Sequence, residues 1–241
     1  MNIEIWSDFS CPFCYIGKRR FEEALALFPN KENVNVIYRS FELDPNAERD
    51  LPHGVNEMLA SKYGMSVDKA KEMNAGVTAQ AQSVGLTFNF DTMILTNTFD
   101  AHRLAHFANQ HGLMYALTER LLHAYFTESK HLGDHETLAA LAAEVGLDKD
   151  EALQVLAGDA FTAEVRNDEQ EAGSLGVRGV PFFVINRKYA ISGAQSSEVF
   201  LGAIQKAWDE DQPLTLLNDM GSDPADGTCD DGVCAPSQPK P

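Results

Sequence analysis

Short apolar runs near both ends of the chain, and a long helix-like stretch between them, dominate the hydrophobic pattern of this sequence. Residues 2–7 and 33–41 are rich in β-branched and aromatic side chains, so both predict strands. Between them, apolar residues recur at i, i+3, i+4 and i+7 from Phe21, on one face of a predicted helix over residues 12–28. This order predicts a parallel β-α-β unit with a right-handed crossover.

The middle of the chain has the composition and the period of helices. It is rich in Ala, Leu, Glu, Lys and Gln, with Gly or Asp at the breaks. The predicted helices cover residues 55–63, 67–84, 96–110, 114–127, 135–145, 149–157 and 160–175. A connection between strands needs far fewer residues. We therefore expect a helical insertion that builds one wall of a substrate cleft.

Strand patterns return after the helices. Residues 181–186 and 189–192 predict two strands joined by a polar turn, and residues 196–209 predict a final helix. The C-terminal stretch is rich in Pro, Gly, Asp and Ser, which predicts a flexible acidic tail without a core. The predicted domains are a discontinuous β-containing domain, a helical insertion and a tail, at residues 1–48 with 176–212, 49–175 and 213–241.

Composition and charge argue against some classes of binding partner. Apolar residues make up 44% of the 241 residues, enough for a sizeable core. The net charge of −17 would repel phosphates, which argues against nucleic acid. No apolar stretch approaches the ~20 residues that span a bilayer, and the first residues do not resemble a signal peptide. We therefore expect a cytoplasmic protein without a membrane or nucleic-acid partner; the oligomeric state is left open.

Cys11-Pro12-Phe13-Cys14 lies between the first predicted strand and the first predicted helix. A Cys-x-x-Cys pair in this position is typical of thiol–disulfide exchange. Free N–H groups and the helix dipole at a helix N-terminus stabilise a thiolate, here at Cys11. Pro12 suits the first turn, where its missing N–H has no intrahelical partner. The alternatives are an incidental pair or half of a zinc site.

Three motifs together resemble the DsbA family of thioredoxin-fold proteins, and more narrowly its FrnE-like subgroup. They are the segment from Trp6 to Gly17 around the cysteines, the Asn-Thr-Phe-Asp-Ala-His-Arg-Leu segment at 97–104, and the segment from Gly176 to Val184. The resemblance covers about residues 1–210. It implies a thioredoxin-like β-α-β / β-β-α domain with a large all-helical insertion. It also implies a disulfide oxidoreductase in which Cys11 is the nucleophile and Cys14 the resolving thiol.

The resemblance also assigns expected binding residues. It implies a cis Val180-Pro181 bond facing the cysteines, with the Val180 backbone free to pair with a bound peptide. His102 matches the family's Ala-His-Arg-Leu motif and is expected to line the cleft; a structural histidine is the alternative. The expected partners are protein or peptide thiols and disulfides, together with low-molecular-weight thiols. No cofactor beyond the redox-active disulfide is expected.

The segment between the cysteines and the nearby acids differ from the family pattern. Pro12-Phe13 lacks the histidine of strongly oxidising DsbA proteins, so an intermediate potential near the ~ −200 mV of glutaredoxins stays open. Ile5 stands where thioredoxin-like proteins often carry a buried acid. Asp8 is the nearest candidate, either as the cap of the active-site helix or as a proton relay.

Two pairs of histidines have the spacing of metal ligands on one helix. His102 and His106, and His131 and His135, are spaced i, i+4, but no third ligand is evident, so no metal is expected. Arg103 is expected to pair with Asp100 or Asp91.

A second cysteine pair, Cys229 and Cys234, lies in the predicted tail. Its spacing resembles a second cysteine motif of some FrnE-like proteins, and we predict a second redox pair. An all-cysteine zinc site or two inert thiols are the alternatives. A flexible linker of ~16 residues spans ~20–24 Å, which allows exchange with Cys11 and Cys14.

Two other functions remain open at this point. One is an isomerase or glutathione-dependent enzyme similar to 2-hydroxychromene-2-carboxylate isomerase or kappa-class glutathione transferase. These generally have serine at the nucleophile position, so the intact Cys11–Cys14 pair argues against them. The other is a chaperone that holds peptides in the cleft, which could coexist with redox activity.

Overall fold

The computed structural model describes residues 1–211. Its central sheet is buried on both faces, and the side chains of the first strand alternate between them. On strand β1 (Asn2–Ser7), Ile3 and Ile5 belong to the main hydrophobic cluster. Trp6 points to the opposite face and belongs to a second, smaller cluster with Val184. Burial on both faces explains why β1 is apolar over most of its length.

Four strands form this mixed sheet in the order β2-β1-β3-β4. Strand β1 pairs in parallel with β2 (Asn35–Ser40) and antiparallel with β3 (Phe182–Ile185). Strand β4 (Tyr189–Ser192) closes an antiparallel hairpin with β3. The predicted strands are confirmed to within two residues at each end.

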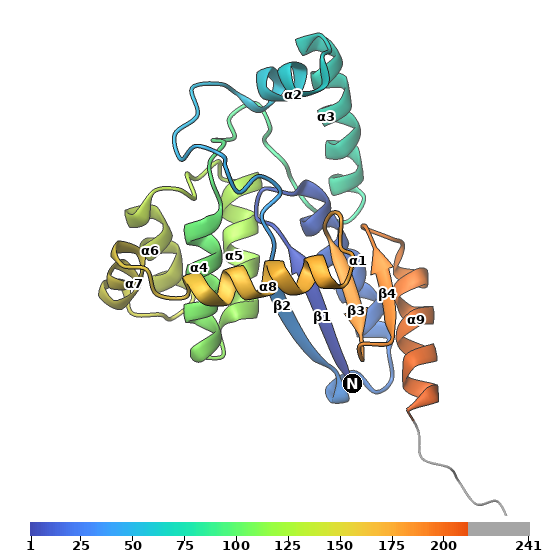
Figure 1. Cartoon of the computed structure of the whole chain (residues 1–241). Helices are drawn as coiled ribbons and strands as arrows, with labels where there is room; N and C mark the ends of the chain where they lie inside the picture. Colours follow the sequence, from blue (N-terminus) through green and yellow to red (C-terminus); the bar gives the residue numbers. More distant parts are fainter. Residues whose placement is uncertain (212–241) are drawn as a thin grey trace, which may run out of the picture. The chain divides into compact units, whose positions relative to one another are not determined.

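The helices follow the order predicted from the sequence (Figure 1). Their bounds are α1 Pro12–Leu27, α2 Val55–Tyr63, α3 Val67–Gln82, α4 Phe99–Gln110, α5 Met114–Phe126, α6 His135–Glu144, α7 Lys149–Ala157, α8 Thr162–Ser174 and α9 Ser197–Glu210. A short 3-10 turn, Lys31–Asn33, precedes β2 and was not predicted. The predicted α/β class with a large helical segment between the two β-containing parts is confirmed.

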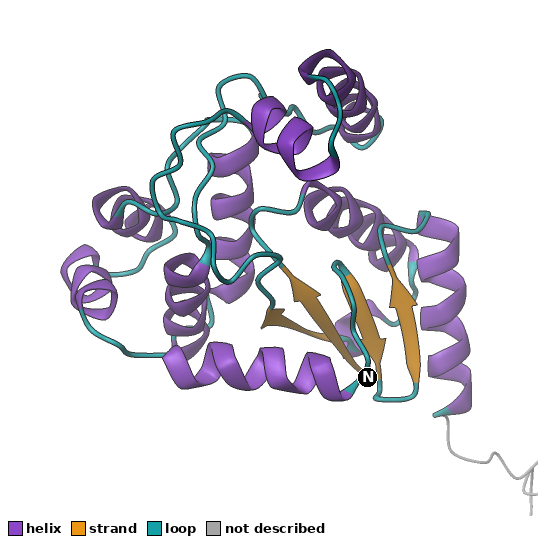
Figure 2. Cartoon of the chain, turned by 45° about the horizontal axis from the view of Figure 1, so that its top comes forward, coloured by secondary structure: helices purple, strands orange, loops and turns teal. Residues whose placement is uncertain are grey.

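Helices cover both faces of the sheet (Figure 2). Helices α1 and α9 pack together on the main-cluster face, where the ring of Phe21 lies 5.5 Å from that of Phe183 and 5.8 Å from that of Phe200. Helix α8 contacts β2 on the other side, and the Trp6 indole N–H donates to the backbone oxygen of Asp168 at 2.9 Å. The sheet therefore lies between a layer formed by α1 and α9 and a layer that contains α8.

The main hydrophobic cluster continues from the sheet into the helical segment. The ring of Tyr15 on α1 lies 6.0 Å from that of Phe88, and the ring of Phe88 lies 4.6 Å from that of Phe126 at the end of α5. Residues Met1–Glu210 form one compact unit. The boundaries at 48/49 and 175/176 stay predictions.

Within residues 1–211, no helix is long and apolar enough to cross a lipid bilayer.

Candidate active site

The two cysteines occupy the start of α1. Cys11 is the N-cap residue with extended backbone, and Pro12 is the first helical residue. The backbone N–H of Cys14 donates to the Cys11 carbonyl at 3.1 Å, which closes the first turn. Both side chains are free thiols, 4% and 2% exposed respectively, while Phe13 between them is 39% exposed. The helix start thus presents an aromatic side chain to solvent directly beside two sheltered sulfurs.

The loop before β3 lies against Cys11. The Val180–Pro181 peptide bond is cis, as predicted. The Cys11 thiol donates to the Val180 carbonyl oxygen at 3.5 Å. The Pro181 carbonyl accepts from the Gly193 N–H at 2.8 Å, which anchors the loop to the end of β4. The predicted juxtaposition of residues 11 and 180–181 is therefore present, and their role in substrate binding stays a prediction.

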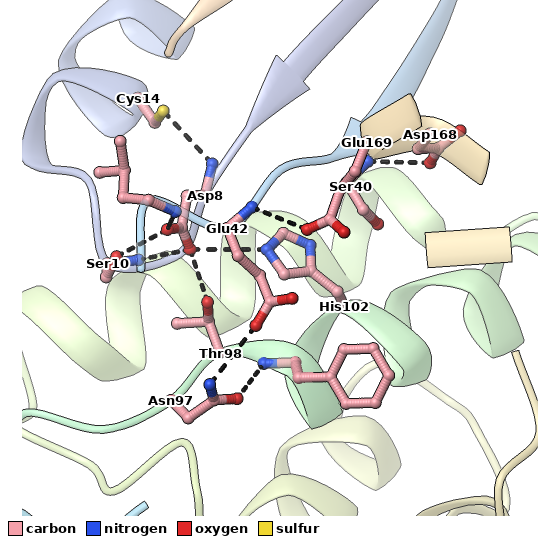
Figure 3. A network of polar contacts seen from close by, with 12 residues as sticks. Asp8, Ser10, Cys14, Ser40, Glu42, Asn97, Thr98, His102, Asp168 and Glu169 are labelled. Atoms are coloured by element: carbon pink, nitrogen blue, oxygen red, sulfur yellow. Dashed lines mark hydrogen bonds and ion pairs between the residues drawn. The ribbon is translucent and has the colours of Figure 1, made fainter. Parts of the chain in front are cut away.

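Cys14 lies deeper than Cys11 and has different partners. Its sulfur accepts a hydrogen bond from the backbone N–H of Asp8 at 3.4 Å (Figure 3). Burial raises the pKa of Cys14 well above its ordinary value, and the hydrogen bond and charge of Cys11 raise it further. Ser7 and the Asp8 N–H offset part of this rise. Cys14 therefore keeps its proton until an acceptor removes it.

The carboxylate of Asp8 is buried and saturated with donors (Figure 3). It accepts from the hydroxyls of Thr98 and Ser10 and from the backbone N–H of Leu43, each at 2.8 Å. Burial by itself raises the pKa of Asp8, but His102, Leu43 and Thr98 together lower it below its usual value. Asp8 is thus held as a buried anion.

The predicted capping role of Asp8 is wrong. Helix α1 has no side-chain cap, because the Asp8 carboxylate turns toward α4 and the segment after β2 instead. The backbone oxygen of Asp8 accepts from the Cys11 N–H at 3.2 Å, and its carboxylate accepts from the N–H of Ser10 just before the N-cap residue at 3.2 Å.

His102 lies inside the protein on α4. Its side chain is almost fully buried, its ring lies 4.7 Å from that of Phe9, and its Nε2 lies 3.5 Å from Asp8 Oδ1. The expectation that His102 contacts substrate stays a prediction. Its neighbour Arg103 donates to Asp100 at 2.7 Å, while Asp91 accepts from an asparagine instead.

The other histidines of the two i, i+4 pairs are engaged with protein groups. His106 lies 3.0 Å from Asp168 Oδ2, and His135 lies 2.7 Å from Asp100 Oδ2. His131 contacts the Arg49 carbonyl at 2.9 Å. Over residues 1–211, no group of three or more His, Cys, Asp or Glu side chains could hold a metal ion.

Sequence reasoning missed three members of the site. Ser7 and Thr98 lie inside the quoted motifs, but nothing in their spacing shows that they face Cys14 and Asp8. Gly17 allows Pro181 to approach α1, and the signal was a glycine inside a helical pattern. The predicted second redox pair, Cys229 and Cys234, lies outside the described residues.

Comparisons with known proteins agree with this geometry. The model of the DSBA-like thioredoxin domain family matches residues 2–205. The uncharacterized protein YwbO of Bacillus subtilis (strain 168) is 30% identical over 206 residues, which cover 85% of this chain and 96% of that protein. The structure of a probable DsbA oxidoreductase from Streptomyces coelicolor is 45% identical, covers 93% of this chain and 97% of that one, and gives a TM-score of 0.85.

A more distant structure shares the fold alone. It is a 2-hydroxychromene-2-carboxylate isomerase, 15% identical, which covers 88% of this chain and 98% of that chain with a TM-score of 0.69.

Proposed function

The chain belongs to the DSBA-like thioredoxin domain family, and on this basis we propose that it is a thiol–disulfide oxidoreductase whose active site is Cys11-Pro12-Phe13-Cys14. The family supports an oxidoreductase or isomerase role. The finer assignment to these two cysteines, and to the FrnE-like subgroup, is our proposal. The alternative of an isomerase with a serine nucleophile is disfavoured by the second thiol at Cys14.

The unequal surroundings of the two thiols carry the proposal. Cys11 lies at the helix N-terminus beside the Val180 carbonyl and next to the exposed Phe13. Cys14 lies behind it, with its pKa raised by burial and by Cys11. This difference supports a first attack at Cys11 and a second step at Cys14.

The reaction follows from this order. In reduction, the Cys11 thiolate attacks a substrate disulfide, forms a mixed disulfide and releases one substrate thiolate. Cys14 then loses its proton and attacks the Cys11 sulfur. The Cys11–Cys14 disulfide forms and the second substrate thiolate leaves with the electron pair. The same steps in reverse oxidise a substrate dithiol, so one site serves both directions.

The surface near the sulfurs suits a protein or peptide substrate. Phe13 offers an exposed aromatic ring, and the backbone of Val180 and Pro181 borders Cys11. An extended peptide that pairs with this loop would present its sulfur to Cys11. A low-molecular-weight thiol would need only the sulfur contact.

Two serine variants test the proposal. Cys11→Ser should lower insulin-disulfide reduction to the uncatalysed rate, because no attacking thiolate remains. Cys14→Ser should instead accumulate mixed disulfides at Cys11, detectable by mass, because the resolving thiol is gone. Wild-type turnover in Cys11→Ser would refute the oxidoreductase assignment.

A further inference from the structure

A small cavity of about 10 Å³ lies beside Ser7, the last residue of β1. It is enclosed by the end of β1, by β2, and by α4 and α5. Its polar lining includes the side chains of Ser7, Tyr38, His102 and Thr118. This volume is at the lower limit of the space that one water molecule needs.

Three polar atoms in this lining lack a hydrogen-bond partner among the described residues. They are the hydroxyl of Tyr38, Nε2 of His102 and the hydroxyl of Thr118, all completely shielded from solvent. The contact of His102 Nε2 with Asp8 Oδ1, at 3.5 Å, is longer than a hydrogen bond. Buried polar groups are almost always paired, and a buried water typically makes about three hydrogen bonds. One water in this cavity would satisfy these atoms together.

The cavity is connected to Cys14. Ser7 belongs to the cavity lining, and its peptide bond to Asp8 carries the N–H that donates to the Cys14 sulfur at 3.4 Å. A hydrogen bond from Ser7 also lowers the pKa of Cys14, against the larger effect of burial. Burial raises the pKa of Tyr38 well above its ordinary value, so this phenol stays protonated beside the cavity. A proton that leaves Cys14 therefore has polar groups beside it, although the sulfur itself is shielded from bulk water.

We propose that this cavity holds a water molecule and that Ser7, the water and His102 form the relay that removes the proton from Cys14 when it resolves a mixed disulfide. This inference rests on the oxidoreductase function proposed above. The Cys14 S–H bond breaks and its proton passes through Ser7 and the water to His102. The thiolate attacks Cys11, the Cys11–Cys14 bond forms, and the substrate sulfur leaves as a thiolate with the electron pair. The imidazolium then returns its proton to solvent or to that thiolate.

Asp8 gives His102 its place in this relay. Ile5 stands on β1 where thioredoxin-like proteins often carry a buried acid, so this strand supplies no carboxylate there. The Asp8 carboxylate is held ionised by its donors and lies 3.5 Å from His102 Nε2, where it stabilises a charge that the imidazole takes up. Other titratable or charged groups around the relay are Cys11, Tyr38, Arg39, Glu42 and Tyr125.

The relay can be tested by separating the two thiol reactions. In the full-length chain carrying Cys229→Ser and Cys234→Ser, a chromogenic aromatic disulfide should release one thiolate when Cys11 attacks it. The second thiolate is released when Cys14 resolves the mixed disulfide. Replacing His102 by Gln should change the rate of the first phase far less than that of the second. It should slow the second at least ~10-fold near pH 7, because general acid–base assistance typically contributes ~10²–10⁴-fold. The difference should shrink as hydroxide replaces the relay at higher pH.

His106→Gln is the matched control, one helical turn further along α4. His106 contacts Ser40 and Asp168 and does not belong to the cavity lining. Equal slowing of the second phase by His106→Gln would show a structural effect and overturn the relay. A second phase and a pH profile in His102→Gln that match those of the parent chain would also overturn the relay.

A second variant tests the water and covers the case in which His102→Gln does not fold. Thr118→Val removes one hydroxyl at nearly constant volume and should slow only the second phase, while Thr118→Ser should restore it. A wild-type second phase in Thr118→Val overturns the water-mediated route. Absence of the first phase in the parent chain would instead refute the oxidoreductase function itself, so the two failures are distinguishable.

Discussion

Gly17 lies where the loop of Pro181 comes nearest to α1. A Cβ atom on this glycine would lie 3.0 Å from Pro181 Cγ and 3.3 Å from Ala194 Cβ. Neither neighbour is the free end of a flexible chain, because Pro181 is a ring anchored by Gly193. Because Gly17 has no side chain, the Pro181 loop can lie directly against α1, and this contact sets the distance between the loop and Cys11.

We predict that Gly17→Ala weakens both the active site and the fold. The added methyl group should push the Pro181 loop away from Cys11 and lower disulfide reductase turnover about tenfold, with a loss of ~1–3 kcal/mol in stability from overpacking. Turnover and denaturant unfolding measure both effects. Gly202→Ala is the control, since nothing lies near its Cβ on α9; it should keep turnover and gain ~0.5–1 kcal/mol. Equal turnover in the two variants would contradict the prediction.

The chemistry of single residues was only partly predictable from the sequence. The cysteine pair could be recognised, because its spacing and its place before a helix are local properties. The surroundings of Asp8 could not, because Thr98 and Leu43 are 90 and 35 residues away and meet Asp8 only after α4 and β2 have packed. The same holds for His102, whose exposure depends on which face of α4 the rest of the fold covers.

At the scale of elements, a group of charged side chains joins α1 to α5. Lys18 is buried, and its amine contacts both Glu22 and Glu119 at 2.5 Å. Arg19 also contacts both carboxylates. Burial alone raises the pKa of Glu119, but the hydrogen bond from Arg19 and the charge of Lys18 outweigh it and lower the pKa to about 2. The ion pairs therefore require an ionised Glu119.

We predict that Glu119 makes the protein sensitive to acid. Its pKa in the folded state is below the ordinary 4.5, so its stabilising contribution is complete above pH 4.5 and is lost as the pH falls toward about 2. Glu119→Gln should lower stability by about 1 kcal/mol at pH 7, because solvent screens a partly exposed group. It should also flatten the loss of stability between pH 4.5 and 2.

Denaturant unfolding of both proteins at a series of pH values measures this difference. Glu72→Gln is a suitable control, because Glu72 pairs with Lys69 on the exposed surface of α3 and should change the profile little. An acid profile of Glu119→Gln parallel to that of the wild type would rule out the coupling.

Most elements could be predicted because each shows its own period. Helices α2 and α7 begin and end at the predicted residues, and α4 starts three residues later than predicted, at Phe99. The difference at α4 has a physical cause, since Asn97 and Thr98 use their side chains for local and distant hydrogen bonds before the helix begins.

At the scale of the whole molecule, the order of the elements predicts the fold, whereas the packing of the core joins the sheet to the helical segment. The order β-α-β, helices, β-β-α predicted the sheet and the insertion. It did not predict that Tyr15, Phe88 and Phe126 would carry one hydrophobic cluster from α1 into the helical segment. Such contacts depend on tertiary packing between residues far apart in sequence.

The last prediction concerns the whole chain and its four cysteines. We propose that Cys229 and Cys234 exchange a disulfide with Cys11 and Cys14. A tether of this length gives an effective concentration of order mM without a docked interface. Asp230 and Asp231 lie between Cys229 and Cys234 in the sequence, and their negative charges should raise the pKa of both thiols. Cys11 should therefore remain the more reactive thiol.

A redox titration with mass mapping, on the full-length protein and on a chain ending at Met220, measures this exchange. The full-length protein should show a shifted Cys11–Cys14 potential and, in a Cys14→Ser background, a crosslink from Cys11 to Cys229 or Cys234. Identical potentials and turnover without such a crosslink would leave the second pair outside the catalytic cycle. Cys11 would then have to exchange electrons directly with an external thiol, because within this chain Cys14 can only resolve what Cys11 has bound.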